Sequence, residues 1–158
     1  MIRCRRSLRH GQSLVEFALI APLLFALMFV LVELGIVFSV YIGLTNSARE
    51  AARAGVAYQY ASSSSGTPST ATVDAGRSAV MNSAIMDTLN PIVDISSVSE
   101  LTPTYIYDPA TPTNNNYRYG DKLTVTLSYP HALFFNFFNA GTITIQASSE
   151  MRLEPGGF

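Results

Sequence analysis

The sequence predicts an α+β protein, in which a long N-terminal transmembrane helix continues into a small domain with a second helix and an antiparallel sheet of about three strands. Three observations support this class. An apolar run fills residues 14–44, apolar side chains recur at helical spacing over residues 75–89, and two late segments alternate apolar with polar residues.

A basic leader opens the chain. Arg3, Arg5, Arg6 and Arg9 lie close together with no acid among them. Four of the ten basic residues thus fall within residues 1–11, which leaves six against eleven acidic residues, a formal charge of −5 for the rest. No basic patch remains for a nucleic-acid backbone, so we expect no nucleic-acid partner. Charged residues make up 13% of the chain, about half the globular average, which indicates that part of it lies in lipid.

The apolar run is longer than a bilayer requires. Residues 14–44 would form a helix of about 46 Å, whereas about 20 residues cross the hydrocarbon core. The helix is therefore expected to start in the membrane and continue beyond it, and the arginines before it predict a cytoplasmic N-terminus and an extracytoplasmic remainder. A secretory signal, the first alternative, has a shorter apolar core of about 7–15 residues.

Two inferences follow from the single cysteine, Cys4. It precedes any apolar stretch, which disfavours a lipoprotein, and the chain has no second cysteine for an internal disulfide. An extracytoplasmic domain must therefore be stabilised by packing and hydrogen bonds alone.

Good helix formers continue past the apolar run, which predicts one helix over residues 12–58, kinked at Pro22 because proline removes a backbone donor. Every fourth residue on part of this helix is small, a spacing that lets two helix backbones approach closely. We predict a helix-packing role for this stripe over chance as the alternative; its members are Gly35, Ser39, Gly43, Ser47, Ala51 and Gly55.

Residues 59–158 are predicted to form the extracytoplasmic domain. The small, polar residues 61–72 are typical of a flexible loop. Asp74 is then expected to cap a helix over residues 75–89, which Asn90 and Pro91 end.

The pattern then becomes β-like. Residues 92–99 are a weaker strand candidate and residues 104–108 a better one, followed by a turn region over residues 108–121. Residues 122–129 alternate clearly and are expected to end at Pro130, and residues 141–153 alternate again.

The domain lacks the residues that catalysis needs. His10 lies in the leader, which leaves only His131 beyond it, and the acids are scattered. Asp108 and Asp121 flank one loop and could meet across it; we interpret them instead as acids of a solvated turn. No spacing is typical of a metal site, a nucleophile with its base or a phosphate loop. We therefore expect no enzyme, no metal and no cofactor.

Four phenylalanines crowd a short segment late in the chain. We interpret them as an aromatic core beneath the sheet; the alternative is an exposed patch for a neighbouring subunit or the membrane surface. They are Phe134, Phe135, Phe137 and Phe138.

The segment GQSLVEF, from Gly11 to Phe17, resembles the processing site of type IV pilin-like proteins. The wider pattern is similar to the TadE-like family of tight-adherence (Tad/Flp) pilus systems, through ELG at residues 33–35 and NSAREAAR at residues 46–53. The strands LTVTLSYP and TITIQASSEMRL also resemble the end of such domains. The likeness implies that a prepilin peptidase removes residues 1–11 by cleaving after Gly11, which makes Gln12 the first mature residue.

The resemblance implies a non-enzymatic minor pilin or pseudopilin that acts in pilus assembly or surface adhesion, anchored in the cytoplasmic membrane and able to enter an extracellular filament. Its partners would be the prepilin peptidase, other pilin or pseudopilin subunits and the assembly machinery. In a filament, Glu16 would pair with the new amino group of an adjacent subunit, which lowers the cost of burying both charges. Glu33 would lie near the opposite membrane interface. The alternatives are an uncleaved single-pass anchor with an extracellular binding domain and, less favoured, a secreted enzyme accessory.

Overall fold

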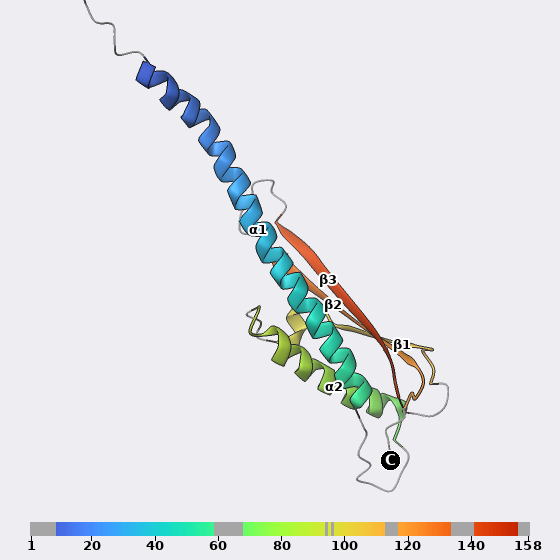
Figure 1. Cartoon of the computed structure of the whole chain (residues 1–158). Coiled ribbons are helices and arrows are strands. Elements are labelled where there is room, and N and C mark those ends of the chain that lie inside the picture. Colours follow the sequence, from blue (N-terminus) through green and yellow to red (C-terminus); the bar gives the residue numbers. More distant parts are fainter. Residues whose placement is uncertain are drawn as a thin grey trace, which may run out of the picture.

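The computed structural model describes residues 9–58, 68–93, 95, 97–112, 117–133 and 141–154. The helices α1 and α2 come first along the chain, followed by a short 3-10 helix and the strands β1, β2 and β3. Figure 1 shows α1 as a long rod whose second half packs against α2 and the sheet, while its first half stands clear of both. The predicted α+β class is confirmed.

Helix α1 spans Arg9–Ala57 without a break and continues through Pro22. It begins three residues before Gln12, so the helix runs across the predicted cleavage point. Residues such as Leu, Ala and Phe dominate it, and their apolar side chains cover every face of its first half. A helix that is apolar all round belongs in lipid or among other helices.

Helix α2 spans Thr70–Leu89, and it begins earlier than the sequence predicted. Ser69 is the N-cap, and its side chain accepts a hydrogen bond from the backbone N–H of Thr72. The prediction that Asp74 caps this helix was therefore wrong. Asp74 lies within the helix, where its carboxylate binds Arg77 and Arg118 instead.

The sheet has the order β1-β2-β3 with both pairs antiparallel. Its strands are Thr104–Asp108, Lys122–Ala132 and Thr142–Arg152. The predicted alternation is confirmed, because every second side chain of β2 and β3 turns towards the helices. The buried members of that face include Leu123, Val125, Leu127, Ile145 and Ala147.

Two strand predictions were wrong in part. The described residues of 92–99 form no strand, and the 3-10 helix Val98–Glu100 follows a turn there. Pro130 does not end β2, which continues to Ala132. The pairing of β1 with β2 ends at Thr104 and Thr126, so the later residues of β2 have β3 as a partner on one side and no described strand on the other. A proline, which has no backbone N–H to donate, is tolerated in such an edge position.

The core lies between the sheet and the two helices. Small residues of α1 allow the close approach, since Ala48, Ala51 and Ala52 are fully buried. Larger side chains fill the remaining space from α2 and the sheet, and each is removed from water completely. They are Met81, Ile85, Leu89, Leu123, Val125 and Leu127.

A buried polar network closes the end of the domain away from the exposed half of α1. The Arg77 side chain, only 2% exposed, donates hydrogen bonds to the backbone oxygens of Gly55 (3.1 Å) and Tyr117 (3.0 Å). Asp74 lies 3.2 Å from Arg77 and 2.9 Å from Arg118. In a domain without a disulfide, these contacts connect α1, α2 and the segment before β2.

The second arginine of this network stacks on an aromatic ring. The Arg118 guanidinium carbon lies 4.3 Å from the ring centroid of Tyr107, and the backbone of Arg118 takes a left-handed φ of 62°. Burial is the largest cause that raises the pKa of Tyr107. Asp121 is only 1% exposed and lies 3.8 Å from Arg118, so the prediction of a solvated Asp121 was wrong, whereas Asp108 is exposed.

Candidate functional site

The first half of α1 exposes a continuous apolar surface. Leu14, Phe17 and Leu19 are 69%, 67% and 75% exposed, and large apolar side chains stay exposed as far as Ile42. The mean hydropathy of the most apolar window in this helix is 2.6, and only 11% of that window is buried. Helix α1 is therefore long and apolar enough to anchor the chain in a membrane.

Near the start of α1, one acid interrupts this surface. The Gln12 side-chain nitrogen donates to Glu16 Oε1 over 3.2 Å, one turn along the helix, and both side chains are exposed. A methyl group added at Gly11 would meet nothing within 4 Å. The fold therefore gives no steric reason for glycine at this position, where alanine would favour the helix by about 1 kcal/mol.

The stripe of small residues divides into two parts. Gly35 and Ser39 are exposed, and a Cβ at Gly35 would meet nothing within 4 Å. Beyond them, a Cβ at Gly43 would lie 3.2 Å from Leu89, and one at Gly55 would lie 2.7 Å from the Met81 sulfur. The second part thus lies against α2 and the sheet of the same molecule, where Ser47 and Ala51 are also buried.

A second acid of the apolar run, Glu33, contacts the sheet. Its Oε1 lies 3.4 Å from Nε2 of His131 on β2, and Glu33 is 9% exposed. The far end of the β2–β3 pair therefore reaches α1 seventeen residues beyond Glu16, about 26 Å along the helix. Glu33 thus contacts the domain instead of projecting from the helix.

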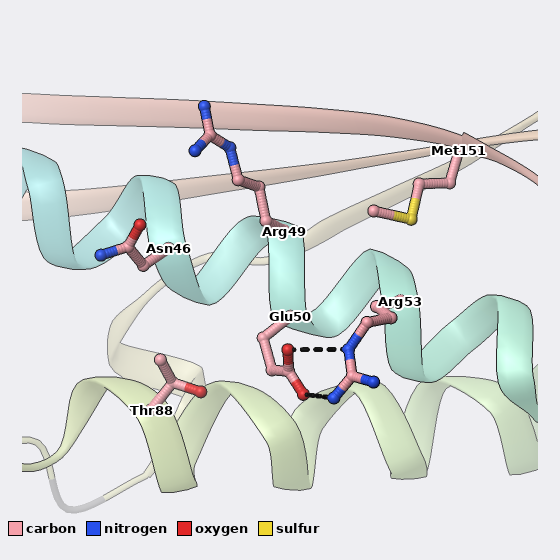
Figure 2. Close-up of a pocket in the computed structure, with 6 residues that line it drawn as sticks. All are labelled: Asn46, Arg49, Glu50, Arg53, Thr88 and Met151. Carbon is pink, nitrogen blue, oxygen red and sulfur yellow. Dashed lines mark hydrogen bonds and ion pairs between the residues drawn. The ribbon is translucent and has the colours of Figure 1, made fainter.

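A polar ridge follows on α1, and we define it by Asn46, Arg49, Glu50 and Arg53. Figure 2 shows Arg53 bound to Glu50 by two hydrogen bonds, of 3.0 and 2.5 Å, while Arg49 projects away from them. The bond from Arg53 lowers the pKa of Glu50. With Thr88 and Met151, the ridge lines a hollow of about 460 Å³ between α1, α2 and β3.

Most of these features lie on residues 11–53 of α1, and that segment matches the model of the TadE-like protein family. Residues 11–53 are TadE-like. The match begins at Gly11 and ends at Arg53, so it contains the exposed apolar surface and the polar ridge but no part of α2 or the sheet. No curated protein and no solved structure matches the chain.

The TadE-like segment indicates a protein associated with a Tad pilus, a structural kind of protein. Its helix supports a membrane location. Among the residues that the structure describes, no group of three or more His, Cys, Asp or Glu side chains is placed to hold a metal ion. Residues 134–138, with the four phenylalanines, lie outside the described residues, so both interpretations of that cluster stay predictions.

Sequence reasoning missed two contacts near the TadE-like segment. The Glu33–His131 pair joins the one histidine beyond the leader to an acid in the apolar run, and the pairing of two such unusual residues was the available signal. The Arg77 network had no local signal, because its partners on Gly55 and Tyr117 are 22 and 40 residues away in the chain.

Proposed function

We propose that this chain is a pilin-like structural subunit, a minor pilin or pseudopilin, of a tight-adherence type IV pilus or a related secretion system. The observation that carries the proposal is an exposed carboxylate, Glu16, near the start of a TadE-like apolar helix that stands clear of its domain. A charged side chain in such a surface is costly in lipid and is typical of a functional site.

Cleavage after Gly11 would supply the partner of that carboxylate. The α-amino group of Gln12 would be positive, and in a filament it would meet Glu16 of an adjacent subunit. Positions 12 and 16 are separated by about 6 Å along a helix. Such a pair therefore shifts one subunit by about 6 Å along the filament axis relative to its neighbour. Pairing offsets the cost of burying each charge among apolar helices.

The surroundings of Gly11 support a role in recognition by a peptidase. The glycine is exposed, has open space around it and lies inside a helix that it weakens. A prepilin peptidase at the cytoplasmic membrane face would remove residues 1–11, whose four arginines favour the cytoplasmic side. The mature chain would consist of the helix over residues 12–58 and the extracytoplasmic domain over residues 59–158.

The remaining partners follow from the same proposal. The exposed apolar surface of α1 suits first the membrane and then the helices of other pilin or pseudopilin subunits, with Gly35 and Ser39 allowing close approach. The assembly machinery in the membrane would transfer the subunit between these two environments. Pilus assembly or surface adhesion is the function that this arrangement supports.

Two variants in the native cell test the proposal. We expect Gly11→Leu to retain residues 1–11 and to be missing from filaments, whereas Gly35→Leu, at a helix position with equally open surroundings, should still be cleaved. We expect Glu16→Gln to be cleaved but to fall about tenfold or more in filaments, a change of about 1.4 kcal/mol or more.

The control for Glu16→Gln is Asp108→Asn, which removes an exposed acid on β1. It should leave the amount of chain in filaments unchanged. Full function of the Gly11→Leu chain, with its leader intact, would instead support an uncleaved membrane anchor and contradict the proposal.

A further inference from the structure

Two opposite charges on the helical side of the domain have no partner within the described residues. Arg49 on α1 and Asp87 on α2 are both exposed, and neither makes an ion pair or a hydrogen bond with a described residue. The other charged residues of α2 and of α1 beyond Gly43 are all paired, as Glu50 with Arg53 and Asp74 with Arg77. The two free charges are therefore available to another molecule.

Each of these charges lines a hollow of its own. Arg49 is one of the residues that line the hollow of the polar ridge, shown in Figure 2. Asp87 lines a separate hollow of about 450 Å³ with Met86, Asn90 and Pro91. The two hollows are similar in volume and carry opposite charges. One copy thus offers a cation in one place and an anion in another. A contact between such unlike surfaces can repeat from copy to copy, as a closed ring or as an open helical filament.

The contacts between α1 and α2 show how far along the α1 axis Arg49 and Asp87 each lie. Helices α1 and α2 run in opposite directions, since Gly43 approaches Leu89 and the Gly55 carbonyl accepts from Arg77. Thr88 lines the same hollow as Asn46, so Asp87 lies about level with residue 47 of α1. Within one copy, Asp87 is therefore a little nearer the membrane than Arg49.

The stagger of the proposed filament keeps the two charges at similar heights. Pairing of the Gln12 amino group with Glu16 displaces one subunit outwards by four helical residues, about 6 Å. Asp87 of the displaced copy then lies about level with residue 51 of its neighbour, between Arg49 and Arg53. Asp87 is two helical residues, about 3 Å, from the level of Arg49 both without this displacement and with it. The displacement that pairs Gln12 with Glu16 is therefore compatible with a pair between Arg49 and Asp87.

We propose that Arg49 of one copy binds Asp87 of the next copy, so that the polar ridge and α2 form a second contact between subunits outside the membrane. This inference rests on the proposed function, because the stagger comes from cleavage after Gly11. The contact would hold neighbouring domains together outside the membrane. An acidic segment of a different protein is the other occupant, and the experiments below separate the two.

The first test is a disulfide between two singly substituted chains. Arg49→Cys and Asp87→Cys are co-expressed in the native cell with tags of different size, and Cys4 is lost with the leader on cleavage. We expect a mixed dimer on a non-reducing gel of the filament fraction. Arg49→Cys with Asp108→Cys is the matched control and should give at least about tenfold less mixed dimer, because Asp108 is an exposed acid on β1 and does not line the hollow of Asp87.

The second test exchanges the charges. Arg49→Asp alone and Asp87→Arg alone should each reduce the amount of this chain in filaments by about tenfold or more, because like charges then face each other. The double variant should recover most of the lost amount. A different acidic partner would leave the double variant as poor as Arg49→Asp, which would overturn the contact between copies.

The two proposals fail in different ways. A processed chain that enters filaments but shows neither the mixed dimer nor recovery by charge exchange overturns this contact alone. A chain that keeps residues 1–11 and never associates with other copies overturns the proposed function and, with it, this contact.

Discussion

Replacing Arg77 with methionine tests whether the buried polar network stabilises the domain. Arg77 is 2% exposed, and its guanidinium donates to Gly55 O at 3.1 Å, to Tyr117 O at 3.0 Å and to Asp74 at 3.2 Å. Methionine keeps much of the volume, so the main loss is the donated hydrogen bonds. Asp74 retains Arg118 at 2.9 Å as a partner.

The magnitude follows from the acceptors that lose their donor. A buried acceptor left without a partner costs about 1–3 kcal/mol, and two backbone oxygens are affected. Two such acceptors give about 2–6 kcal/mol, and the bond to Tyr117 O is only part-buried, so we expect Arg77→Met to lower the free energy of unfolding by about 2–4 kcal/mol. The loss should be smaller than the 3–5 kcal/mol typical of breaking a buried pair completely, because the Asp74 carboxylate stays paired.

The assay is urea unfolding of the full chain in detergent micelles, followed by tyrosine fluorescence, since the protein has eight tyrosines and no tryptophan. Arg49→Met is the matched control, because Arg49 is exposed and without a described partner, and it should change the free energy by less than about 0.5 kcal/mol. Equal midpoints for the two variants would refute the reasoning.

Two further predictions concern packing and pH. Gly55→Ala should lower the free energy of unfolding by about 1–3 kcal/mol, because its Cβ would lie 2.7 Å from the Met81 sulfur and 2.8 Å from Leu123, whereas Gly35→Ala, with open surroundings, should not destabilise the protein in the same urea assay. Burial raises the pKa of Tyr105 from 10 to about 12, so its contribution to stability is present below pH 10 and is lost as the pH rises towards 12. Between pH 10 and pH 12, the urea midpoint of Tyr105→Phe should therefore fall less than that of the unsubstituted protein. An equal fall in both proteins would show that ionisation of Tyr105 does not cause it.

Much of the fold could be predicted because local patterns determine it. A long apolar run specifies α1, and strict alternation specifies the inner face of β2 and β3. The errors arose where two local signals compete. Asp74 and Ser69 both suit an N-cap; Ser69 takes that place before a helix that begins at Thr70, and Asp74 binds two buried arginines from within the helix. Pro130 stays in β2 because β1 has already ended beside it.

The site was predicted less completely, and the reason is distance along the chain. Gly11, Gln12 and Glu16 lie within one short segment, so their spacing could be recognised from the sequence alone. The hollow of the polar ridge joins α1 to Thr88 and Met151, and the Glu33–His131 pair joins α1 to β2. Such contacts depend on how the elements pack, which no local pattern specifies.

The most direct measurement of the central claim is the intact mass of this chain in filaments sheared from native cells. The account predicts a mass that corresponds to a chain beginning at Gln12, without residues 1–11. A chain that begins at Met1 in those filaments would contradict cleavage after Gly11, the role of Glu16 and the subunit contacts derived from them.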